Sequence, residues 1–98
     1  MAMIIKVDGT VEHVEGLGKN GELTYEQIRE AIGGGFIERV MCDPKVTEGH
    51  DHFYCDEEGK LKNLTINLKA TALSTHTANV DMICGDVIFV KTRGENEF

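Results

Sequence analysis

A stretch without acidic residues, from Lys60 to Val80, holds side chains that could bind an anion. Its lysines stand among amides and hydroxyls, and a helix could begin near Asn67. Ammonium groups, short polar donors and the N–H groups of a helix start all favour negatively charged oxygen. The alternative interpretation is an ordinary solvated face. The sequence predicts an anion-binding surface at Lys60, Lys62, Asn67, Lys69 and Thr71, to which Arg39 or Arg93 could be added across a subunit interface.

Acidic residues are concentrated before this stretch and indicate a second kind of surface. Residues 1–58 include 13 acidic and 5 basic side chains, whereas residues 59–98 include 4 acidic and 5 basic ones. Carboxylates gathered on one surface can imitate the phosphates of a nucleic acid towards a basic protein. The alternative hypothesis is therefore an acidic interaction surface made by Glu48, Asp51, Asp56, Glu57 and Glu58.

A third hypothesis concerns metal binding by Cys42, His50, His52 and Cys55. These residues have the ligand types of a tetrahedral zinc site. However, their spacing, C-x7-H-x-H-x2-C, matches no standard zinc finger, and free cysteines are commonly small core residues. Core and loop positions are thus the preferred interpretation, and a zinc-stapled structural module is the alternative. We expect no cofactor, and no catalytic residues, because no nucleophile motif surrounds Ser74.

Composition limits the classes of protein that the chain can represent. With 98 residues, 41% of them hydrophobic, it fits one compact domain whose small core makes self-association into a homo-oligomer an expected addition. A net charge of −7 disfavours binding to duplex nucleic acid. No apolar run approaches the roughly 20 residues of a membrane span. An odd number of cysteines and the lack of a basic-then-apolar leader indicate a cytoplasmic protein.

The first half of the chain gives the clearest predictions of secondary structure. Two β-rich runs, Met3–Val7 and Val11–Val14, bracket the pair Asp8-Gly9 and predict a hairpin. A helix is expected over Thr24–Ile32, because Thr24 and Gln27 form a capping box, and residues 33–35 are glycines that end it.

The second half is predicted to supply the rest of the sheet. Phe36–Met41 and His52–Asp56 are expected to be strands, and Val80–Lys91 is expected to be a buried strand with a bulge at its glycine. The segment 61–73 fits both a strand and a helix, and we favour an extended start followed by a short helix near Asn67. Residues 94–98 are expected to form a frayed tail. The predicted fold is therefore α+β, a small, mostly antiparallel sheet with one clear helix and a second short one.

Several pieces of the chain occur in the order found in a known family. They are Ile5–Thr10, Ile32–Glu38, Asp56–Lys62, Asn67–Thr71 and Gly85–Ile88. In these pieces the chain resembles domain-of-unknown-function family 3846, small proteins common in phages and mobile elements of bacteria, whereas the loop Asp43–Asp51 departs from that pattern. The resemblance implies a compact α+β domain with an accessory role in a bacterial host cell, and it supplies no activity. By analogy with phage proteins that sequester nucleotide signals, the expected anion is a phosphorylated nucleotide acting as a defence signal.

Overall fold

The computed structural model describes residues 2–42, 49–74 and 82–90. Within these residues the protein has an α+β fold of five strands and two helices, as the sequence predicts. The elements in chain order are β1 (Ala2–Ile5), β2 (Val11–Val14), α1 (Tyr25–Ala31), β3 (Ile37–Met41), β4 (His52–Asp56), α2 (Leu68–Ser74) and β5 (Val87–Val90).

The five strands form one antiparallel sheet in the order β2-β1-β5-β4-β3. The last strand, β5, lies at its centre and pairs with β1 through Met3 and Phe89, and with β4 through Phe53 and Phe89. The sheet is therefore completed only when the two ends of the described chain meet in its middle.

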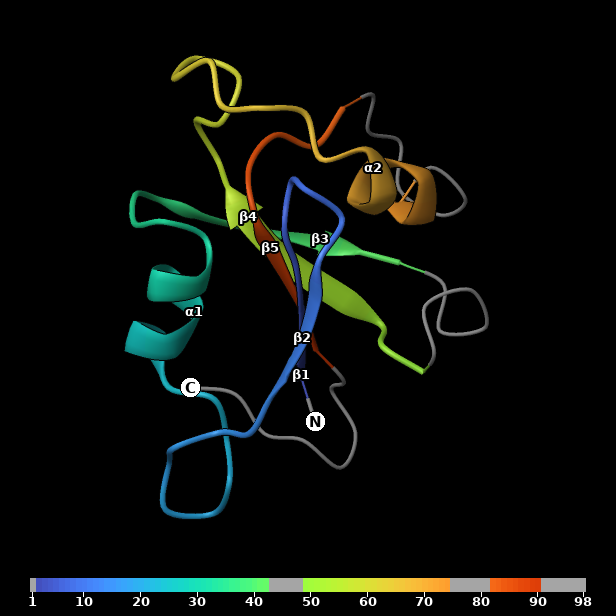
Figure 1. Ribbon diagram of the computed structural model, residues 1–98. Helices are drawn as coiled ribbons and strands as arrows, with labels where there is room; N and C mark the ends of the chain where they lie inside the picture. Colours follow the sequence, from blue (N-terminus) through green and yellow to red (C-terminus); the bar gives the residue numbers. More distant parts are fainter. Residues whose placement is uncertain (1, 43–48, 75–81, 91–98) are drawn as a thin grey trace.

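The sheet has a helix on each face, so the fold has three layers (Figure 1). On the side of α2, Phe53 and Phe89 stack with ring centroids 4.8 Å apart, and Ala70 packs in the same cluster. On the side of α1, Ile28 packs with Ile88. Side chains that follow one another along a strand point to opposite faces, and the wholly buried β5 supplies both cores.

The first helix confirms its predicted capping box. The hydroxyl of Thr24 accepts from the Gln27 backbone N–H, and the Gln27 side chain accepts from the Thr24 N–H, both at 3.1 Å. Leu23 and Ile28 are buried on either side of the cap, as a hydrophobic staple requires. Among the described residues, no helix is long and apolar enough to cross a membrane.

Three predicted strands are longer than those observed. The strand predicted at Phe36–Met41 differs by one residue, because β3 begins at Ile37. The expected strand Val80–Lys91 is observed only at Val87–Val90, because Gly85 adopts a φ of +93° and its N–H donates to Thr65 O at 2.8 Å. Its first two residues and Lys91 lie outside the described part. Likewise, β1 ends at Ile5 instead of Val7, where the hairpin turn begins.

Segment 61–73 ends in a short helix near Asn67, as we favoured from the sequence. Its extended part, however, begins later than predicted. Leu61–Asn63 is a turn, Ile66 makes an isolated bridge to Cys84, and α2 begins at Leu68. Asn67 caps α2, since its Oδ1 accepts from the Ala70 N–H at 3.0 Å. The predicted tail 94–98 lies outside the described residues.

Candidate functional site

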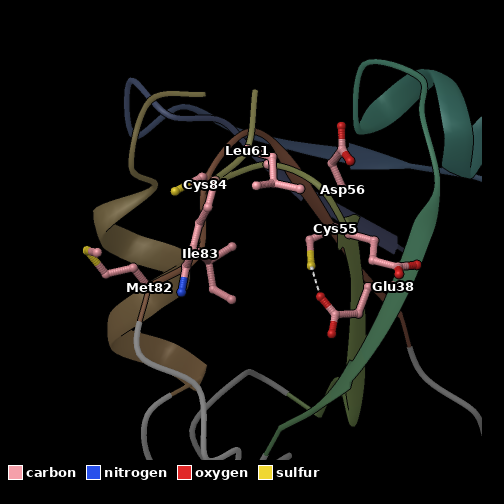
Figure 2. A pocket seen from close by; sticks show the side chains of 10 residues that line it. Glu38, Cys55, Asp56, Leu61, Met82, Ile83 and Cys84 are labelled. Carbon is pink, nitrogen blue, oxygen red and sulfur yellow. Dashed lines mark hydrogen bonds between the residues drawn. The ribbon is translucent and has the colours of Figure 1, made fainter. Parts of the chain in front are cut away.

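A hollow of about 710 Å³ opens on the α2 side of the sheet, near the carboxyl end of β4 (Figure 2). Glu38 of β3 and Cys55 of β4 lie on one side of it, and Met82 and Ile83 lie on the other. The turn after β4 supplies Gly59 and the remaining wall. The full lining consists of Glu38, Cys55, Asp56, Glu57, Gly59, Lys60, Leu61, Met82, Ile83 and Cys84.

Carboxylates outnumber cations in this lining. It contains the three acids Glu38, Asp56 and Glu57 but one lysine, Lys60. Asp56 is buried, and its charge is balanced from outside the lining by Lys62, whose Nζ lies 2.8 Å from Asp56 Oδ2. Glu38 and Glu57 are exposed to solvent. The hollow is therefore suited to a cationic group above an apolar wall.

The thiol of Cys55 is held in its neutral form. Burial, the nearby carboxylate of Glu38 and a hydrogen bond to that carboxylate raise the pKa of Cys55 from 9.0 to about 12. The Sγ–Oε1 distance of 3.8 Å shows that the thiol acts as a weak donor towards Glu38. A nucleophilic cysteine needs a lowered pKa, so this microenvironment opposes thiolate chemistry at Cys55.

Two polar residues predicted to bind an anion have partners inside the fold. Asn67 is fully buried, and its Nδ2 donates to Ile5 O at 2.9 Å and to Gly85 O at 3.0 Å. The Thr71 hydroxyl accepts from the Ile83 N–H at 2.9 Å. The start of α2 is thereby tied to the sheet and to the segment before β5.

The cationic residues of the same prediction lie in different surroundings. Lys60 lines the hollow, Lys62 is paired with Asp56, and Lys69 is exposed on α2. Arg39 is exposed on β3, and Arg93 lies outside the described residues. Of the predicted anion-binding residues that the structure describes, Lys60 alone lines the hollow, so a cleft built from this set stays a prediction.

Comparison with known proteins identifies the family. A family model, "Domain of unknown function (DUF3846)", matches residues 1–98, the whole chain. The chain belongs to the DUF3846 family. The resemblance inferred from its sequence pieces is thus confirmed. No curated protein and no solved structure matches the chain.

In this DUF3846 chain the four candidate zinc ligands do not form one cluster. Cys42 Sγ donates to the backbone O of His50 at 3.5 Å. The His52 ring packs edge-on against Tyr54, on the α1 side of β4, whereas Cys55 belongs to the core on the α2 side. Within residues 2–42, 49–74 and 82–90, no group of three or more His, Cys, Asp or Glu could hold a metal ion.

Some of the acidic residues predicted to form an interaction surface already contact a basic side chain, and others are accessible to solvent. Asp51 Oδ1 lies 2.6 Å from His52 Nδ1, and Asp56 is paired with Lys62. Glu57 is exposed and Glu58 half-buried in the turn after β4, and Glu48 lies outside the described residues. Glu57 is the member of this set that is both exposed and part of the hollow.

Glu38 is the residue that the sequence interpretation missed. It lies opposite Cys55 in the β3–β4 ladder, so both side chains point to the α2 face. Alternation along Phe36–Met41 places Glu38 on the same face as Val40. That pattern could have assigned its face, but the opposition to Cys55 depends on the pairing register.

Proposed function

We propose that this DUF3846 protein is a non-enzymatic binding protein whose acidic hollow accepts a basic group of a partner protein. The single observation that supports this most directly is the lining of the hollow, where Glu38 and Glu57 are exposed carboxylates. The accessory role that the family resemblance implies would make the partner a basic protein in the cytoplasm of a bacterial host.

The shape and chemistry of the hollow favour an amphipathic cation. Leu61 is 82% exposed and Met82 is 44% exposed, and both line the hollow. An arginine or lysine has an aliphatic stem that packs on apolar surface and a charged end that pairs with a carboxylate. A basic side chain next to an apolar one would therefore meet complementary groups on both walls.

The neutral state of Cys55 supports binding in preference to catalysis. The thiol of Cys55 donates to Glu38, and its pKa of about 12 keeps it protonated at neutral pH. Stoichiometric binding requires no such group to react, so this environment agrees with the proposal.

Calorimetric titration with the peptide acetyl-Leu-Arg-Leu-amide tests the proposal. We expect the double variant Glu38→Gln/Glu57→Gln to bind this peptide about tenfold more weakly than the unaltered protein, because the charge pairing is lost. The matched control is Glu15→Gln/Glu26→Gln, which makes the same change in net charge at exposed residues away from the hollow. Equal weakening in both double variants would contradict a local site.

The nucleotide hypothesis is tested in the same experiment with cyclic and linear nucleotides as the second set of probes. Charge repulsion by Glu38 and Glu57 predicts no measurable heat with these anions. Binding of a nucleotide, weakened by Lys60→Glu and Lys69→Glu and accompanied by no binding of the basic peptide, would overturn the proposal in favour of nucleotide sequestration.

A further inference from the structure

We propose that the outer edge of β3 binds an extended segment of the partner protein as an additional antiparallel strand, with a basic side chain of that segment beside Glu38. This inference rests on the proposed function, since it names how a basic partner would be held. Within the described part of the chain, β3 is the terminal strand of the sheet and pairs with β4 on one side.

Two hydrogen bonds fix which backbone groups of β3 are used inside the sheet. The Cys42 N–H donates to Asp51 O at 3.0 Å, and the Glu57 N–H donates to Phe36 O at 2.8 Å. The residue pairs Cys42–Asp51 and Phe36–Glu57 continue the β3–β4 register. In an antiparallel ladder, opposed residues alternate between hydrogen-bonded and non-hydrogen-bonded pairs. Even-numbered residues of β3 therefore form the bonded pairs with β4.

The odd-numbered residues consequently turn their backbone groups outward. The N–H and C=O groups of Glu38 and Val40 face β4, whereas those of Ile37 and Arg39 face the outer edge. A row of outward N–H and C=O groups is the template that β-strand addition uses. This edge also adjoins the hollow, because Glu38 is part of both.

Charges on β3 specify what kind of strand would fit. Glu38 lies on the α2 face and Arg39 on the opposite face, and both side chains are exposed. Opposite charges facing each other across neighbouring strands are stabilising, and like charges are destabilising. The edge thus disfavours strands with like charges at these two positions and favours one with a basic residue opposite Glu38 and an acidic residue opposite Arg39.

A second copy of this chain fits the edge less well than such a partner. Antiparallel pairing of β3 with itself over its full length, Ile37–Met41, places Arg39 opposite Arg39. That like-charge pair would lie at the centre of the interface. The charge pattern therefore favours a different protein with complementary charges.

Two peptides of identical composition test the inference. Acetyl-Thr-Val-Glu-Lys-Ile-Thr-amide can place its lysine opposite Glu38 and its glutamate opposite Arg39, whereas acetyl-Thr-Val-Lys-Glu-Ile-Thr-amide reverses the two charges. We expect the first peptide to bind about tenfold more tightly in an NMR titration of the ¹⁵N-labelled protein, because two favourable pairs replace two repulsive ones. The amide signals of Ile37 and Arg39 should shift with it.

Modified peptides and a protein variant separate strand addition from simple charge attraction. N-methylation of the peptide glutamate or isoleucine removes an N–H that faces β3 and should weaken binding at least tenfold. N-methylation of the lysine, whose N–H would point away, should change binding less than twofold. The double variant Glu38→Lys/Arg39→Glu should reverse the preference between the two charge orders.

Each contrary result has a distinct meaning. If acetyl-Leu-Arg-Leu-amide binds but charge order and N-methylation have no effect, strand addition is overturned while the proposed function stands. If no basic peptide binds, the proposed function fails as well. If the protein alone forms a concentration-dependent dimer that shifts the Ile37 and Arg39 amides, the occupant is a second copy and the inference is wrong.

Discussion

Asn67 shows how one buried amide can hold three segments together. Its side chain binds the carbonyls of Ile5 and Gly85 and caps the start of α2 through Ala70. It has no exposed surface, so removing its side chain leaves these buried backbone groups without the partners that it supplies.

We therefore expect Asn67→Ala to lower the free energy of unfolding by about 3 kcal/mol, because buried polar groups lose their partners. Urea denaturation at constant pH measures this change. Asn20→Ala, at an exposed asparagine, is the control and should change stability by less than about 0.5 kcal/mol. Similar losses in the two variants would contradict the role assigned to the buried amide.

Cys55 gives a second prediction for a single residue. Because its pKa is raised to about 12, alkylation by iodoacetamide in the native protein should stay slow when the pH rises from 7 to 10. Peptide mapping by mass spectrometry measures it, with urea-unfolded protein as the control. Rapid native alkylation near pH 8 would mean that the thiol is not held neutral.

The same shift sets the direction of a pH effect on stability. The pKa of Cys55 is higher in the folded protein than its ordinary value of 9.0. Its contribution to stability is therefore complete below pH 9 and is lost as the pH rises towards 12. Glu38→Gln removes one cause of the shift and should lower the pKa of Cys55, so that alkylation accelerates at a lower pH.

At the scale of elements, the loop between α1 and β3 depends on glycine for two different reasons. Gly34 and Gly35 have φ values of +88° and +89°, which residues other than glycine rarely adopt. A Cβ on Gly34 would meet nothing within 4 Å, whereas one on Gly35 would lie 2.5 Å from Lys62 Nζ and 2.9 Å from Asp56 Oδ2. Of the three glycines in this loop, Gly35 is therefore the one that packs on the Asp56–Lys62 ion pair.

This difference predicts unequal effects of the same substitution. Gly34→Ala should destabilise the protein by about 1 kcal/mol through backbone strain alone. Gly35→Ala should cost about 2–3 kcal/mol, because it also displaces Lys62 from a buried carboxylate. Thermal or urea unfolding measures both. Equal losses would show that the ion pair adjusts without cost.

For the whole molecule, the position of β5 between β1 and β4 makes the sheet a single cooperative unit. All four residues of β5 have no exposed surface. Amides of central strands exchange with solvent only when much of the structure opens, whereas outward-facing edge amides exchange readily.

Hydrogen exchange followed by NMR should separate these two groups. The Ile88 and Phe89 amides are expected to exchange at rates set by global unfolding. The Ile37 and Arg39 amides should exchange orders of magnitude faster, although they also belong to a strand. Strong protection of Ile37 in the free protein would show that the β3 edge is already covered, which would contradict the accessible edge on which the further inference depends.

Much of the fold can be predicted from the sequence, because its helices, turns and strands carry local signals within a few residues along the chain. The capping box at Thr24 and Gln27, the Asp8-Gly9 turn and the run His52–Asp56 ahead of the turn at residues 56–59 each predict one element, and each element is observed. The strand predicted over Val80–Lys91, with a bulge at Gly85, is longer than the observed β5, because an apolar run does not reveal the φ of a glycine within it. The family could also be recognised from pieces of sequence.

The sequence alone therefore determined the elements, the α+β class and the family, because each depends on neighbours along the chain. Only the tertiary structure decided the candidate site. The pairing of β3 with β4 places Glu38 opposite Cys55. The turn after β4 brings Lys62 into an ion pair with Asp56, whereas the sequence had suggested an anion as its partner. These partners are separated along the chain by 17 and 6 residues. Charge patterns cannot show which of them meet until strand register and turn geometry are fixed.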